Sequence, residues 1–247
     1  PAPGSAPQAA PLPAATPSPQ GVTASLPPAV PAPSPTDTAV AETEPTPKPK
    51  QPHIDRSGQY LMHAVALAGL FTIDKSLNDS INQHGFLGAQ PGNVSSILQL
   101  GEGFTDFALM EAVHLTTDNP TTLAATSDAA KAVLNAGINV QLLKTLFGRG
   151  NPNIGADQGN FRGPTLTSGH DSFPSGHTAT AFAMATALGH YYPKKKPLFY
   201  TLAGVVGLST LAAHIHWASD VYAGALLGIW SGEQTVDKKP NLLFFKF

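Results

Sequence analysis

The sequence predicts an all-α domain, and three observations lead to that prediction. Between His53 and Trp230, apolar residues recur with helical spacing in long stretches. No stretch shows the alternation of apolar and polar residues that marks a series of strands. No internal repeat is visible either. We therefore expect helices that pack on one another around one core.

Composition narrows the function classes. The net charge is −2 over 247 residues, so no strong attraction to nucleic acid is expected. The chain has no cysteine, which excludes disulfides, thiolate metal sites and cysteine nucleophiles. Charged residues make up 12% of the chain, against about 25% in an average protein. This deficit indicates a chain that buries much of its length or lies near a membrane.

Three segments are predicted: a disordered linker at 1–52, a helical domain at 53–233 and a tail at 234–247. Most of the 24 prolines fall in the first segment, which is rich in Pro and Ala and has no apolar periodicity. A flexible tether after a cleaved N-terminus suits an exported protein, so we expect an extracytoplasmic location, periplasmic or secreted. The tail ends in "NLLFFKF", and either packs back on the domain or contacts a membrane surface.

The first half of the domain contains four predicted helices, at residues 59–85 (one helix or two), 94–103, 104–116 and 126–148. For the last of these, Thr126 or Ser127 is the expected N-cap and Gly148 the expected stop. A loop rich in Gly, Pro, Asn and Asp follows at 149–174. Loops longer than about 15 residues inside a domain are often functional.

Three apolar helices complete the domain, at residues 175–192, 197–217 and 218–232. A membrane span needs about 20 apolar residues. The second of these helices comes closest, but histidines and an aspartate follow its uncharged stretch. We expect a soluble or peripheral domain, with membrane insertion as the alternative.

His216 and Asp220 form the first candidate for chemistry. If one helix runs through both, their spacing of four puts them on one face, together with Ser209 seven residues earlier. The carboxylate then orients the imidazole and leaves its second nitrogen free as a nucleophile or base. The alternative is a core histidine beside a capping aspartate.

The tetrapeptide "PSGH" at Pro174–His177 is the second candidate. Gly176 allows a close approach of the backbone to a ligand, and a helix start offers N–H groups to an anion. The Ser175 hydroxyl adds a donor, and His177 is placed to protonate a leaving oxygen. The alternative is an ordinary helix start with a proline near its first turn.

Lys144 and Arg149 form the third candidate, at a helix C-terminus and in the loop after it. The helix dipole alone favours cations at this place. Together the two side chains would also clamp a phosphoryl group.

Taken in chain order, from Lys144 through "PSGH" to His216 and Asp220, the three candidates resemble the type 2 phosphatidic acid phosphatase (PAP2) family, which shares its fold with vanadium haloperoxidases and bacterial class A acid phosphatases. The family pattern is Lys-x6-Arg-Pro, then Pro-Ser-Gly-His, then Ser-Arg-x5-His-x3-Asp. The resemblance covers Lys144 to Gly228. The second block matches fully, and the third matches at Ser209, His216 and Asp220.

This resemblance implies a helical bundle with the active site at one end and a metal- and cofactor-independent phosphatase. His216 would attack phosphorus, Asp220 would orient it, and His177 would protonate the leaving group. The expected substrate-binding residues are Lys144, Arg149, Ser175, Gly176 and Ser209. The substrate would be a lipid phosphate, an isoprenoid diphosphate or a small soluble phosphate ester, with contact to a membrane surface as a further expectation.

Two positions depart from the family pattern. Asn151 and Thr210 stand where the family has arginines. Each missing guanidinium removes a bidentate phosphate contact, and loss of one transition-state donor typically costs roughly 10²–10³ in rate. Arg149 and Arg162 are the candidates to replace them. The alternative is a weakened or inactive member that binds phosphate or a lipid phosphate.

Two further histidines, His170 and His214, have no place in the family pattern. Together with the catalytic candidates they form a pool of ligands for a divalent metal, but their spacing fits no standard zinc motif. We therefore predict no metal site. His214 is expected to point away from His216, because helical residues two apart diverge.

Overall fold

The computed structural model describes residues 57–84 and 102–238, and within these ranges it contains helices and no strand. The helices are α1 (Ser57–His84), α3 (Gly103–Leu115), α4 (Pro120–Phe147), α5 (Gly176–Tyr191), α6 (Lys196–Ala212) and α7 (Ala218–Val236), with short 3-10 turns η2 (Pro152–Ile154) and η3 (Pro193–Lys195). The all-α prediction is confirmed. The linker at 1–52, most of the predicted helix at 94–103 and the tail from residue 239 lie outside the described residues. The division of the chain into three segments therefore stays a prediction.

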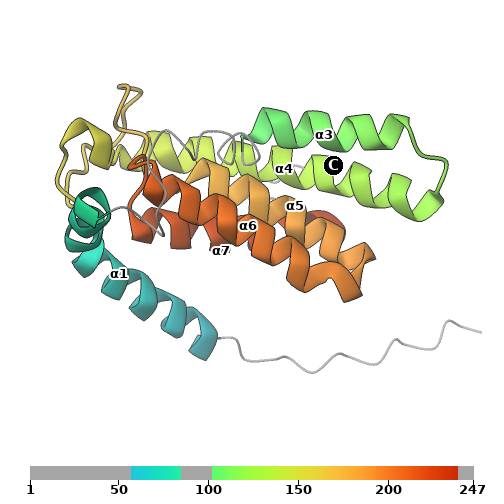
Figure 1. Cartoon of the computed structure of the whole chain (residues 1–247), viewed down its shortest axis with the longest axis horizontal. Coiled ribbons are helices and arrows are strands. Elements are labelled where there is room, and N and C mark those ends of the chain that lie inside the picture. The colour runs from blue at the N-terminus through green and yellow to red at the C-terminus, as the bar shows by residue number, and fades with distance from the viewer. Residues whose placement is uncertain (1–56, 85–101, 239–247) are drawn as a thin grey trace, which may run out of the picture. The chain divides into compact units, whose positions relative to one another are not determined.

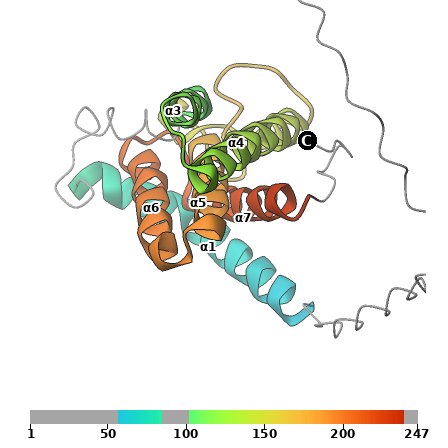
Figure 2. The same cartoon turned by 90° about the vertical axis from the view of Figure 1, so that its right-hand side faces the viewer.

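Helix α5 lies at the centre and contacts α3, α4, α6 and α7 (Figures 1 and 2). Its sequence explains this central position, because its buried side chains are uncharged and also small, so that four helices can approach it closely. They are Thr178, Ala179, Thr180, Ala181, Ala183, Ala185, Thr186, Ala187 and Gly189. A larger side chain at these places would push a neighbouring helix away.

Three glycines of α7, spaced four apart, form the contact with α5. A Cβ atom on Gly224 would lie 2.5 Å from the carbonyl oxygen of Ser175, and one on Gly228 would lie 2.3 Å from that of Ala179. On Gly232 it would lie 2.6 Å from the Cβ of Thr186. The glycines thus set the distance between α7 and α5, and with it the position of the first turn of α7.

Helix α4 begins six residues earlier than predicted. Asn119, rather than Thr126 or Ser127, is its N-cap, and the Asn119 side chain accepts hydrogen bonds from the backbone N–H groups of Thr121 and Thr122 at 3.0 and 3.1 Å. A proline at the first helical position favours this start. The predicted end is confirmed: Gly148 adopts the left-handed conformation with φ 56°.

Helix α6 ends earlier than predicted. It stops at Ala212, and His214 has a φ of 55°, which breaks the helix before His216. His216 therefore lies in the connection to α7, and Asp220 lies in the first turn of α7. One helix therefore does not run through both residues, and the condition for placing them on one helical face is not met. Their spacing brings them together because the chain reverses between the two helices.

The predicted long loop is confirmed between α4 and α5 (Figure 1). Its backbone folds back on the end of α4: the N–H of Arg162 donates to Gly148 O, and that of Gly150 donates to Asn160 O. The N–H of Ser172 donates to Arg149 O. These bonds hold the loop beside the start of α5.

Among the described helices, none has the length and apolar character needed to cross a membrane.

We expect Gly228→Ala to lower the free energy of unfolding by about 1–3 kcal/mol, because the added methyl group overlaps the α5 backbone. Gly204→Ala on α6 is the matched control, since nothing lies within 4 Å of its added Cβ. That variant should be neutral or more stable by up to about 1 kcal/mol. Urea denaturation of both variants measures the difference. Equal stabilities would contradict the assigned contact between α5 and α7.

Candidate active site

The three sequence blocks meet at one end of the helical domain. There α4 ends, α5 begins, and the connection between α6 and α7 lies next to the long loop (Figure 1). Ser175 ties two of these parts together, because its N–H donates to the backbone carbonyl of Asp220 at 3.0 Å. Residues far apart in the sequence thus share one site.

The two histidines of the family pattern face each other. The ring centroids of His177 and His216 are 6.3 Å apart, with the planes at 66°. His216 is 4% exposed, while His177 is half-buried. The pKa of His177 is lowered to about 4, mainly by burial and in smaller part by the nearby His216 and Lys144.

Asp220 lies behind His216. Its Oδ2 is 3.8 Å from His216 Nδ1, which is an ion-pair distance but too long for a hydrogen bond. Burial is the main cause that lowers the pKa of His216, and Asp220 opposes it. Burial alone would raise the pKa of Asp220, but His216, Arg149 and Ser172 together bring it below its usual value. At neutral pH this arrangement holds a carboxylate beside a neutral imidazole.

Asp220 is fixed by four other groups. Its Oδ1 accepts from Arg149, and its Oδ2 accepts from the Ser172 hydroxyl and from the backbone N–H of Trp217 at 2.9 Å. The Ser175 N–H holds its backbone carbonyl. With all these contacts in place, the carboxylate has little freedom to turn away from His216.

Arg149 is 0% exposed and lies between two carboxylates. One guanidinium nitrogen pairs with Asp220, and the other pairs with Asp74 of α1 at 2.8 Å. Ser219 joins them, because its hydroxyl and its N–H both donate to Asp74 and its oxygen accepts from Arg149 at 2.7 Å. The rings of Phe71, Phe161 and Trp217 lie around the guanidinium at 4.9–5.5 Å. Both terminal nitrogens of Arg149 are thus paired with carboxylates, and Arg149 holds Asp220 in position.

Lys144 is a basic side chain close enough to both histidines that its charge lowers their pKa values. Its ammonium group donates to the backbone carbonyl of Asp171 and lies 3.7 Å from the Asp171 carboxylate. A Cβ on Gly176 would lie 3.7 Å from Lys144 Cε, so the lysine runs along the start of α5. Burial lowers the pKa of Lys144, and Asp171 and Asp220 oppose this shift.

Ser175 and Ser209 are both buried and hydrogen-bonded locally. Ser175 is the N-cap of α5, and its hydroxyl oxygen accepts from the hydroxyl of Thr178 at 2.9 Å. The Ser209 hydroxyl donates to Val206 O at 2.6 Å within α6. Ser175 therefore stays close to the site, while the Ser209 hydroxyl points its proton back into its own helix.

The two positions that depart from the family pattern have structural partners. Asn151 donates from its side chain to Ile215 O at 3.2 Å and accepts from the Asp171 N–H at 3.3 Å, so it links the loop to the segment that carries His216. Thr210 is 0% exposed, and its hydroxyl donates to Gly207 O at 2.7 Å. Neither brings a charge. Arg162 is exposed in the loop.

The extra histidines take other places. His214 lies 3.0 Å from the side chain of Asn78 of α1, away from the ring of His216. His170 is buried, and within the described residues neither of its ring nitrogens has a hydrogen-bond partner. Across the described ranges, no group of three or more His, Asp or Glu side chains is arranged to hold a metal ion.

Sequence reasoning missed Asp74, Ser172 and Ser219. An acidic residue inside the apolar stretch "LFTID" was the available signal for Asp74, since a buried carboxylate requires a partner. The sequence could not identify Arg149 as that partner, because the pair is 75 residues apart.

We expect Arg149→Ala to lower the free energy of unfolding by about 3–5 kcal/mol, because it leaves two buried carboxylates without their cation. Arg162→Ala is the matched control from the same loop and should change stability by less than about 0.5 kcal/mol. Urea denaturation of the two variants measures both. A loss below about 1 kcal/mol for Arg149→Ala would refute the role assigned to this arginine.

Comparisons with known proteins find relatives of part of this chain. Residues 126–234 match the PAP2 superfamily. A lipid A 1-phosphatase of Porphyromonas gingivalis is 48% identical over 67 residues, which cover 26% of this chain and 15% of that protein. A lipid A 1-phosphatase of Rhizobium johnstonii is 35% identical over 101 residues, covering 40% of this chain and 41% of that protein. The matched part thus spans less than half the length of these curated relatives.

A solved structure shares the fold. The crystal structure of Aquifex aeolicus LpxE superposes with a TM-score of 0.51 at 26% identity, covering 67% of this chain and 95% of that one. The residues that match the family, 126–234, include all three sequence blocks. Residues 126–234 of this chain therefore belong to the PAP2 superfamily.

Proposed function

We propose that the chain is a phosphatase that hydrolyses a lipid phosphate ester through a phosphohistidine on His216. The observation that carries this proposal is the meeting of His216, His177 and Lys144 at one end of the bundle, with Asp220 fixed behind His216. A nucleophile, an orienting carboxylate, a proton donor and a cation are the groups that such a reaction needs.

In the first step, Nε2 of His216 attacks phosphorus. The N–P bond forms as the bond from phosphorus to the ester oxygen breaks, and His177 gives its proton to the departing alkoxide. Asp220 faces Nδ1 and stabilises the positive charge that the ring gains. The fixed position of Asp220 supports this role, because Arg149, Ser172 and Trp217 hold it.

In the second step, water attacks phosphorus and breaks the N–P bond. His177, now neutral, takes a proton from that water, and phosphate leaves. The low pKa of His177 keeps its ring unprotonated at neutral pH, so that the ring is available to accept this proton. A bound phosphoryl dianion opposes the repulsion by Lys144 and raises the pKa of His177, so that it can hold a proton for the first step.

The phosphoryl oxygens would be held by Lys144 and by the start of α5. Gly176 is the first residue of α5, so its N–H lies at the N-terminal end of the helix, which favours an anion. Lys144 lies against Gly176, so both groups can reach one phosphoryl group. Binding here relies on fewer charges than the family pattern provides.

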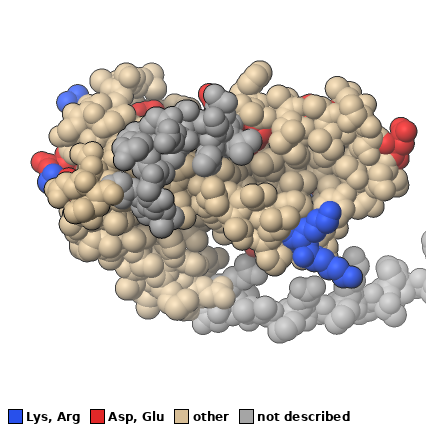
Figure 3. Space-filling view, in the orientation of Figure 1, with Lys and Arg blue, Asp and Glu red and all other residues tan. Residues whose placement is uncertain are grey.

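Two observations support a lipid as the substrate. Both curated relatives described above are named lipid A 1-phosphatases. The face of the domain in Figure 3 also carries few charged side chains among the described residues.

One side of α6 is apolar and exposed. The residues on this side, which are 42–55% exposed, are Leu198, Leu202, Val205 and Leu208. We propose that this side contacts a membrane surface or the substrate's chains.

A second function is favoured by Asn151 and Thr210. With no arginine at either position and Arg149 paired in the interior, the chain would bind a phosphate ester and turn it over slowly or not at all. Both candidates require phosphate binding at His177 and Lys144, so only the rate of turnover separates them.

The pKa of His177 can be measured by NMR titration of its ring. We expect a midpoint near pH 4 without ligand and a higher one with bound vanadate. Because the folded value lies below the usual 6.5, the unfolded chain takes up this proton first as the pH falls. His177 therefore lowers the free energy of unfolding as the pH drops from about 6.5 to about 4. A midpoint near 6.5 in the free protein would contradict the buried position of this ring.

Phosphate release from phosphatidic acid tests the proposed activity. We expect release that EDTA does not affect and that falls by on the order of 10³-fold or more in His216→Ala, which lacks the nucleophile. His214→Asn is the matched control from the same "HIH" stretch, and its rate should stay within about twofold, because Asn tolerates the positive φ at that position. No release from a broad panel of phosphate esters, with intact vanadate binding, would leave only the second function.

Asn151→Arg separates a weakened enzyme from an inactive one. The arginine restores a family cation and should raise the rate, by up to roughly 10²-fold. The substitution removes the hydrogen bonds of the Asn151 side chain with Ile215 and Asp171, so thermal unfolding should be recorded in parallel. A folded variant with no gain would show that charge at this position does not limit turnover.

A further inference from the structure

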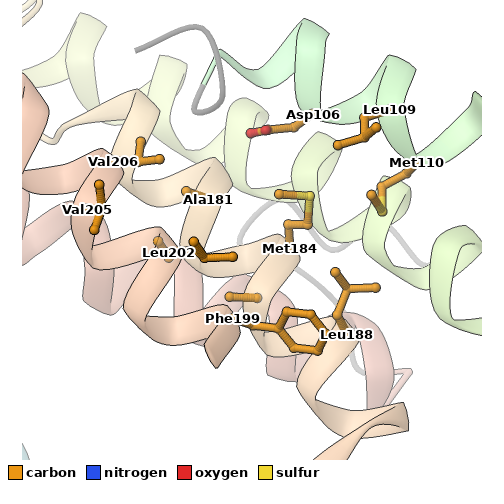
Figure 4. Close-up of a pocket in the computed structure, with 12 residues that line it drawn as sticks. Asp106, Leu109, Met110, Ala181, Met184, Leu188, Phe199, Leu202, Val205 and Val206 are labelled. Carbon is orange, nitrogen blue, oxygen red and sulfur yellow. The ribbon is translucent and has the colours of Figure 1, made fainter. Parts of the chain in front are cut away.

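A pocket of about 330 Å³ lies between α3, α5 and α6, apart from the candidate active site (Figure 4). This volume falls within the range of small-molecule sites. Its walls are almost entirely apolar, and Met184, Leu188 and Phe199 are among the larger side chains that line it. The pocket opens to the surface, because the lining residues Leu109 and Leu202 are 46% and 55% exposed.

Asp106 of α3 is the one ionisable residue among the lining side chains. It is 1% exposed, and its Oδ2 has no hydrogen-bond partner within the described part of the chain. Figure 4 shows its carboxyl group directed from α3 toward α5, at the end of the pocket near Val206. A buried oxygen without a partner is costly, so its presence in an otherwise apolar pocket points to a ligand.

The environment of Asp106 restricts what this ligand can be. Burial raises its pKa to about 7, partly opposed by a hydrogen bond with Thr180. The group therefore exists in both protonation states near neutral pH. An ether or ester oxygen would pair only with the protonated form, whereas a hydroxyl group pairs with both, since it can donate and accept.

The shape of the pocket indicates an extended chain. Its lining follows α5 from Ala181 to Leu188, which spans about 10 Å at 1.5 Å per residue. On α6 the lining runs in the opposite direction, from Phe199 to Val206. One polar group at one end and apolar walls along the rest match a linear molecule with a polar end.

We propose that this pocket binds the hydrocarbon chain of an amphiphile and that Asp106 forms a hydrogen bond with a hydroxyl group on that chain. None of the lining residues belongs to the catalytic set, and two of them, Leu202 and Val205, also belong to the exposed side of α6 described above. Asp106 contacts Thr180, three residues after His177 on α5, so the polar end of the pocket lies toward the catalytic end of the helix.

Direct binding of 1-decanol to the full chain tests the proposal by calorimetry. We expect saturable binding with one molecule per chain. The ether 1-methoxynonane, which has the same number of heavy atoms and no hydroxyl proton, should bind about tenfold more weakly. In Asp106→Leu the two ligands should bind with similar affinity, because the polar partner is gone.

Two further variants locate the site. Ala185→Phe fills the pocket from α5 and should abolish decanol binding. Leu202→Glu places a charge on its exposed wall and should weaken binding at least tenfold, while its 55% exposure favours correct folding. Leu134→Phe, at an exposed position of α4 outside the lining, is the control and should bind as the original chain does. Circular dichroism checks the fold of each variant.

The outcomes are distinct from those of the phosphatase assay. Binding that is lost in the pocket variants supports the site whether or not the chain releases phosphate. No saturable binding of decanol, or binding unchanged in both Ala185→Phe and Leu202→Glu, would overturn it. If a segment of the chain itself fills the pocket, decanol will show no saturable binding, and that result also overturns the proposal.

Discussion

The buried contact of Arg149 with Asp74 and Asp220 is the interaction on which the site depends. It joins three separate parts of the chain: α1, the start of the long loop and the first turn of α7. A guanidinium is suited to this place because its planar fork reaches two carboxylates at once. The two carboxylates carry one more negative charge than the arginine neutralises, and this excess favours positive charge on the neighbouring His216 ring. The same network therefore links α1 to the candidate site and holds Asp220 in place.

Small residues supply the second constraint. Ala and Thr side chains along α5, and Gly224, Gly228 and Gly232 along α7, let the backbones of these helices approach closely. The first turn of α7 carries Asp220, and the first turn of α5 carries His177. Helix packing thus sets the distance between the segments that carry His177 and Asp220.

Much of this arrangement was predictable from the sequence. Helical periodicity identified the helices, and the glycine after Phe147 marked the end of α4, because Gly148 needs a positive φ. Local pattern also selected His177, His216 and Asp220, which do meet in the structure. The predicted start of α4 was wrong. Thr126 and Ser127 are good cap residues, but Asn119 and the proline after it form an earlier helix start.

What the sequence could not provide depends on contacts between distant residues. Arg149 looked like a phosphate ligand because its partner Asp74 is in another helix. The break of α6 before His216 could not be predicted, because the pattern of "LAAHIHW" is typical of a continuous apolar helix. The pocket beside Asp106 likewise requires three helices to be placed in space before it exists.

The contribution of Asp74 bears on where this domain can be cut. The stretch that matches the family starts at residue 126, and α1 lies well before it. A fragment limited to that stretch would contain all three sequence blocks, yet Arg149 would keep only one of its two carboxylates and Ser219 would lose the acceptor of its N–H. The stretch that matches the family therefore lacks part of the network that holds Asp220, and α1 supplies that part.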